Sequence, residues 1–87
     1  MSLSATVLAY NARTSTALEK LILIAIADFA DDAGVSFVPM EMLAEFCAPA
    51  TEAQIAAAVA ALGSDGWLLR KMSAAVDQYH LNLERAP

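Results

Sequence analysis

Permanent positive charge is scarce in this chain of 87 residues. Ten acidic residues outweigh the cations, and the formal net charge is −5. The only lysines and arginines are Arg13, Lys20, Arg70, Lys71 and Arg85. Duplex binding depends on such side chains, because each phosphate that they neutralise releases counterions. The composition therefore disfavours strong non-specific affinity for DNA and fits a basic partner surface better.

Cysteine and long apolar runs are also nearly absent. Cys47 is the single cysteine, which excludes an intrachain disulfide and a thiolate metal cluster. We interpret it as a small buried residue on a helix. The longest apolar run, Leu21 to Ala27, is far shorter than the ~20 residues of a membrane-spanning helix. Met1 to Tyr10 lacks the features of a secretory signal, so the expected location is cytoplasmic.

The chain lacks the groupings that enzymes and metal sites need. One histidine, one cysteine and no Ser/His/Asp cluster leave no pair of nucleophile and base. His80 is interpreted as an ordinary strand residue, because metal binding with Asp77 or Glu84 would require ligands from elsewhere. There is no glycine-rich phosphate loop. We expect a protein that is not an enzyme, with no metal, no cofactor and no small-molecule substrate.

Apolar residues, in contrast, are abundant. They make up 59% of the chain, and no stretch combines low hydrophobicity with high charge. A chain of this length can form one small core. We therefore predict a single domain over residues 1–87. One acidic group is interpreted as a solvated helix end, although it could form a patch: Asp28, Asp31, Asp32, Glu41 and Glu45.

Spacing and capping signals predict the elements of the first half. We expect a short helix over 5–10, a helix over 16–31, a short strand over 35–38 and a helix over 39–47. The second helix follows several hydroxyl residues and has Glu19 in its first turn. One face of that helix carries Leu18, Ile22, Ala25, Ile26 and Phe29. Its other apolar residues suggest a second cover, by the N-terminal helix or another subunit. Leu43 and Phe46 are the expected core contacts of the third helix.

The second half predicts a capped helix followed by a hairpin. Thr51 and Gln54 form a capping-box pair at the start of a helix over 51–63. The residues expected to face the core are Ile55, Ala58, Val59 and Leu62. A β-hairpin is predicted over 66–83, with Ser73 to Asp77 at its tip. Its second strand alternates, with Tyr79, Leu81 and Leu83 on the inward side.

This order of elements is that of a winged helix-turn-helix domain. The expected fold is α+β and mainly helical, with three to four helices, a C-terminal β-hairpin wing and a short extra strand. Several segments carry the resemblance: residues 21–28, 32–34, 36–37, 43–45, 66–68 and 79–82. They resemble the helix-turn-helix family at the N-termini of phage replication-initiator proteins and related plasmid and transcription regulators. The resemblance covers nearly the whole chain.

The resemblance implies a DNA-reading helix after the turn, with a hydroxyl at its start and basic residues on its outward face. Thr51 matches the hydroxyl, but Ala53, Ala56 and Ala57 stand at the basic positions. A methyl group cannot donate a hydrogen bond to guanine or hold a phosphate. The turn also looks about one residue longer than the family pattern, with Pro49 where a glycine is common.

Two hypotheses for the function follow from this conflict between the DNA-reading helix that the resemblance implies and the alanines that occupy its basic positions. The preferred hypothesis is a winged-helix module of a DNA-associated system, in replication or transcription regulation, that acts mainly through protein contacts or self-association. Its candidate contact face is Ala53, Ala56, Ala57 and Ala60. The alternative is sequence-specific DNA binding, by a dimer whose two weak half-sites add. Its candidate contacts are Thr51, Gln54, Arg70 and Lys71. A third possibility is that the chain is one domain of a longer protein that binds DNA elsewhere.

Overall fold

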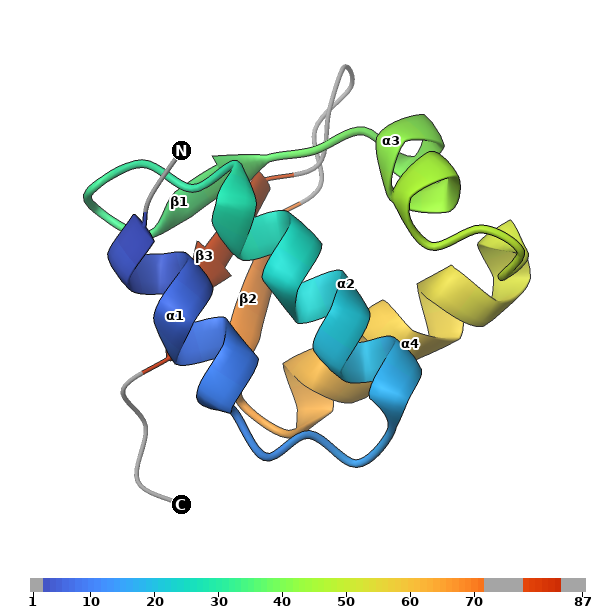
Figure 1. The fold of residues 1–87 in the computed structure, drawn as a ribbon, viewed down its shortest axis with the longest axis horizontal. Coiled ribbons are helices and arrows are strands. Elements are labelled where there is room, and N and C mark those ends of the chain that lie inside the picture. Colours follow the sequence, from blue (N-terminus) through green and yellow to red (C-terminus); the bar gives the residue numbers. More distant parts are fainter. Residues whose placement is uncertain (1–2, 72–77, 84–87) are drawn as a thin grey trace.

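Four helices and a three-stranded antiparallel sheet form the computed structural model, which describes residues 3–71 and 78–83 (Figure 1). The helices are α1 (Leu3–Asn11), α2 (Ala17–Asp28), α3 (Met40–Phe46) and α4 (Glu52–Ser64). The strands are β1 (Val35–Phe37), β2 (Leu68–Lys71) and β3 (Gln78–Leu81). No helix in the described part of the chain is long and apolar enough to cross a membrane.

The last strand of the chain is the central strand of the sheet. The strand order is β1-β3-β2, and β3 pairs antiparallel with both neighbours. His80 lies opposite Val35 on one side and Leu69 on the other. A helix-turn-helix unit followed by a β-hairpin and completed by a short extra strand is the winged helix-turn-helix fold. The mainly helical α+β prediction is confirmed.

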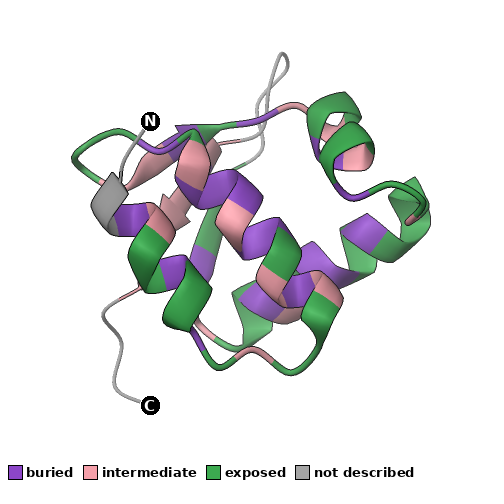
Figure 2. Cartoon of the chain, in the orientation of Figure 1, coloured by how far each residue is buried: buried purple, intermediate pink, exposed green. Residues whose placement is uncertain are grey.

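The core lies between the helices and one side of the sheet, with α2 at its centre (Figure 2). The largest fully buried side chains are Tyr79, Ile22, Leu23, Ile26, Leu43, Ile55, Leu62, Val38 and Val59. Burying side chains of this kind contributes roughly 1.5–3 kcal/mol each relative to leaving them exposed. This burial fixes which side of each helix faces outward.

Helix α1 supplies the second cover that the apolar α2 requires. The two helices pack against each other, and α1 presents buried Ala9 while Ala5 and Ala12 lie near its two ends. Side chains this small let two helices approach closely. Leu23, which lies off the main apolar face of α2, is fully buried as a result. Of the two predicted covers, the N-terminal helix is present.

Helix α2 ends at Asp28, three residues before the predicted end at 31. The chain leaves the helix because Ala30 forms a β-bridge with Ser36 and the Asp31 carboxylate accepts the backbone N–H groups of Ala33 and Val35. Gly34 completes this turn at φ +78°, a conformation that side-chain-bearing residues rarely adopt. Phe29 therefore follows the helix and is 42% exposed.

Other predicted boundaries shift by smaller amounts. The first helix extends beyond 5–10 at both ends, the strand predicted over 35–38 ends one residue early, and Pro39 serves as the N-cap of α3. The α4 helix runs one residue past the predicted range of 51–63, after Thr51 as its N-cap. The predicted hairpin tip, Ser73 to Asp77, lies outside the described residues.

Phe46 corrects the expected core of α3. Leu43 is fully buried, as predicted, but Phe46 is 51% exposed. Helix α3 has only seven residues, and its inward positions are taken by Leu43 and, one turn later, Cys47. Phe46 lies at the edge of that face, so its ring remains largely at the surface.

Candidate nucleic-acid interface

Helix α4 has two chemically different sides. Ile55, Ala58, Val59 and Leu62 are buried, as the helical spacing predicts. The opposite side is exposed and carries Ala53, Ala56, Ala57 and Ala60, followed by Gly63 and Ser64 at its C-terminal end (Figure 2). The side of α4 that would enter a DNA groove in this fold is therefore a row of methyl groups.

The start of α4 is closed by a reciprocal capping box. The Gln54 backbone N–H donates to Thr51 Oγ1 at 3.2 Å, and the Thr51 backbone N–H donates to Gln54 Oε1 at 2.8 Å. Bidentate recognition of adenine requires the same amide oxygen to accept from the base. Reading adenine with Gln54 would therefore disrupt the cap that stabilises this helix.

Charge in and around the helix-turn-helix unit has the wrong sign for a polyphosphate. Residues 21–69 contain no lysine or arginine. The same segment carries Asp28, Asp31, Asp32, Glu41, Glu45, Glu52 and Asp65. Glu52 is exposed in the first turn of α4, where the partial positive charge of a helix N-terminus would otherwise attract an anion. Its carboxylate would meet a phosphate with like charge.

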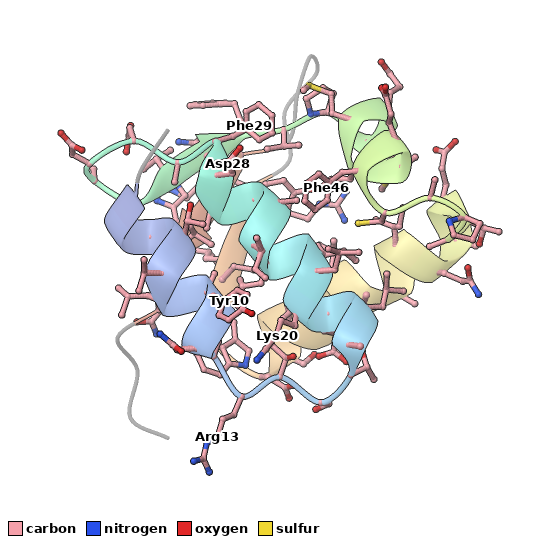
Figure 3. All side chains as sticks on the ribbon, viewed as in Figure 1. Tyr10, Arg13, Lys20, Asp28, Phe29 and Phe46 are labelled. Carbon is pink, nitrogen blue, oxygen red and sulfur yellow. The ribbon has the colours of Figure 1, made fainter. Side chains whose placement is uncertain are left out.

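The cations that could compensate do not gather beside Thr51. Arg13 lies in the loop between α1 and α2 and points away from the body of the protein, and Lys20 lies on α2 beside α1 (Figure 3). Arg70 and Lys71 are exposed on β2, which lies well away from the N-terminal end of α4 (Figure 1). Arg85 is outside the described residues. Within the described residues, no cluster of basic side chains lies beside the turn that precedes α4.

The base of the wing is fixed to the end of α4. The Trp67 backbone N–H donates to Leu62 O at 3.0 Å, and the Asn82 backbone N–H donates to Trp67 O at 2.8 Å. The Asn82 side-chain amide donates to Gly66 O at 3.2 Å, and Trp67 itself is buried. These contacts hold β2, and with it Arg70 and Lys71, in a fixed orientation relative to α4.

The surroundings of Cys47 and His80 are those of residues that serve the fold. Burial raises the pKa of the Cys47 thiol, because the thiolate loses solvation, and the side chain is 2% exposed. His80 is half-buried on the central strand. Among residues 3–71 and 78–83, no group of three histidine, cysteine or acidic side chains is arranged to hold a metal ion.

Comparison with known families agrees with the helix-turn-helix fold. A helix-turn-helix domain model matches residues 16–68, from the N-cap of α2 to the first residue of β2. Because the match covers more than half of the chain, the protein belongs to this helix-turn-helix domain family. Comparison with curated proteins and with solved structures gives no match. Family and fold together define a DNA-associated regulatory module.

Sequence patterning did not single out one surface feature of α2. Lys20, Ile24 and Asp28 follow each other at four-residue spacing on its outer side; all three are half-buried, and Ile24 also packs against the core. The available signal was a cation, an aliphatic residue and an anion in one row of an otherwise apolar helix.

Proposed function

We propose that this protein is a non-enzymatic winged-helix module of a replication or transcription-regulation system that acts mainly through protein contacts. The contact face is the exposed row of Ala53, Ala56, Ala57 and Ala60 on α4. In this hypothesis the fold of a DNA-binding domain is retained, while the helix that would read a groove binds another protein chain.

The observation that supports this proposal is the exposure of that row on a helix without cations. Small side chains allow a partner helix to approach α4 closely, and dispersion contacts grow with the number of atoms brought together. The acidic residues on α3 and at the start of α4 favour a partner with basic residues around its contact surface.

Site-specific photo-crosslinking tests the contact face directly. A photoreactive phenylalanine analogue at Ala57 should give a discrete protein adduct in cells of the source organism, whereas the same group at exposed Ala33 should not. The identified partner should bind the purified protein, and Ala57→Arg should weaken that binding at least about tenfold, as expected for a disrupted interface centre. Equal adducts from both positions would refute the assignment.

The alternative function is sequence-specific DNA binding by Thr51, Gln54, Arg70 and Lys71, in a protein related to phage replication initiators. The observation in its favour is that Arg70 and Lys71 are exposed on a strand fixed relative to α4. It requires measurable duplex binding at low salt that weakens steeply as salt rises.

Fluorescence anisotropy with a pool of random duplexes distinguishes the two functions. Under the alternative, Arg70→Ala with Lys71→Ala should abolish binding, while Arg13→Ala should leave it unchanged. Absence of any duplex binding at low salt would eliminate the alternative and leave the protein-contact hypothesis in place.

A further inference from the structure

The solvent side of α2 carries a short self-complementary row. Lys20, Ile24 and Asp28 lie at positions i, i+4 and i+8, so they share one side of the helix. At a rise of about 1.5 Å per residue, the charged residues are about 12 Å apart along the axis. Ile24 stands midway between them. Reversing the direction of the helix therefore exchanges the cation with the anion and leaves the aliphatic residue in place.

Exposed aromatic rings stand on both sides of this row. Tyr10 of α1 is 68% exposed and Phe46 of α3 is 51% exposed, and both are seen on the face of the molecule that carries α2 (Figure 3). Leu21, also on α2, is exposed next to the row. Apolar side chains gathered on one face, with polar groups around them, are typical of protein interaction sites.

We propose that this face, centred on Ile24, is the interface of a symmetric homodimer. In the commonest class of helix packing, the rows formed by every fourth residue lie parallel on the two helices, at a crossing angle of about −50°. With a two-fold axis near Ile24, the row runs antiparallel to its own copy. The row of each helix lies in the groove beside its copy, so that Lys20 of each chain faces Asp28 of the second copy and the two Ile24 side chains pack side by side across the axis.

The charges favour a second copy over an unrelated chain as the occupant. A two-fold interface must be complementary to itself, and opposite charges placed equally on either side of an apolar centre meet that condition. The protein has a net charge of −5, so two copies repel each other at long range. The two Lys–Asp pairs place attraction at the point of contact, and the rings of Tyr10 and Phe46 add apolar area that the dimer buries.

This interface is independent of the proposed contact face on α4. Helix α4 packs against α2 through its buried residues, so its exposed alanine row points away from α2. A dimer joined through α2 therefore leaves both α4 alanine rows at its surface. Dimers that read DNA through two such helices place both on one side, about 34 Å apart. The α2 dimer is instead suited to binding two partner chains at once.

Sedimentation equilibrium over a wide range of protein concentration tests the dimer. The unmodified protein should show a concentration-dependent dimer, and Ile24→Arg should be monomeric throughout, because it places two like charges at the axis. Ala57→Arg, which adds the same group to the outer side of α4, should leave the dimer intact. A monomeric unmodified protein, or a dimer dissociated by Ala57→Arg and unaffected by Ile24→Arg, would overturn the proposal.

Charge exchange gives a second test that does not depend on substituting Ile24. Lys20→Asp and Asp28→Lys should each weaken dimerisation about tenfold, since each creates two like-charged pairs in place of two attractive ones. The double variant should restore the dissociation constant to within about threefold of the original. Additive weakening in the double variant would exclude the antiparallel pairing. Circular dichroism confirms that every variant remains folded.

Discussion

The buried and exposed sides of α4 place different requirements on the residues of the sequence. The inner side carries branched and small apolar residues that are buried in the core, while the outer side carries exposed alanines. The inner side defines the fold, and the outer side would carry the chemistry of DNA reading. The difference teaches that a helix-turn-helix domain can keep its packing while the exposed side of this helix carries no basic residue, because the two sets of positions are constrained independently.

The largest effect is expected on the inner side. Leu62→Ala should lower the free energy of unfolding by about 2–5 kcal/mol, because it removes a fully buried side chain and leaves a cavity. Ala60→Ser, two residues away on the outer side, should change stability by less than about 0.5 kcal/mol. Urea denaturation of both variants measures the contrast. Similar losses for both would show that the outer side is packed in solution.

Adding cations to the outer side of α4 should raise the affinity for DNA. Replacing Ala53, Ala56 and Ala57 by arginine should raise duplex affinity at low salt roughly tenfold to a hundredfold, and steepen the salt dependence by up to about 2.7 in log–log slope. Glutamine at the same three positions provides the control, because it adds length and hydrogen bonding without charge. An arginine variant with unchanged affinity would mean that this α4 is not presented to a groove.

The cap at the start of α4 should contribute less to stability than the buried side does. Thr51→Ala should destabilise the protein by about 1 kcal/mol, because the Gln54 backbone N–H loses its acceptor. Thr51→Ser keeps the hydroxyl and should retain most of the stability. Thermal unfolding of the two variants provides the measurement, and equal melting temperatures would show that water replaces the cap without cost.

The smallest effect concerns the pH dependence of stability that arises from Cys47, the buried residue at the C-terminal end of α3. Its pKa is raised in the folded protein, so the unfolded chain loses the thiol proton first as pH rises. Stability should be independent of this group well below about pH 8.5, the usual thiol value, and should decline above it. Cys47→Ala should remove that part of the pH dependence. An unchanged alkaline decline in the variant would assign it to other groups.

Local signals made much of the fold predictable. The Thr51 and Gln54 capping pair and the apolar spacing from Ile55 depend on residues within a few positions of each other, and both are confirmed. Where distant contacts decide, the sequence was a poorer guide. The early end of α2 depends on the bridge between Ala30 and Ser36, and the exposure of Phe46 depends on how a seven-residue helix docks.

The candidate site was predictable in a similar way. Spacing alone places Ala53, Ala56, Ala57 and Ala60 outward, and the structure exposes them. The role of this face remains a prediction, because alanine has no chemistry that identifies a partner. The spacing of Lys20, Ile24 and Asp28 is visible in the sequence, but their exposure is not, since it depends on which sides of α2 are left uncovered by α1, α3 and α4.

The position of β3 between β1 and β2 has a consequence for biosynthesis. Because translation proceeds from the N-terminus, β1 and β2 both emerge from the ribosome before the strand that joins them exists. Until residues 78–81 are made, the backbone edges of both strands lack their partner and can pair with other nascent chains. A stop codon before Gln78 would therefore leave a helical fragment prone to aggregation, whereas one placed after Leu83 would spare the sheet.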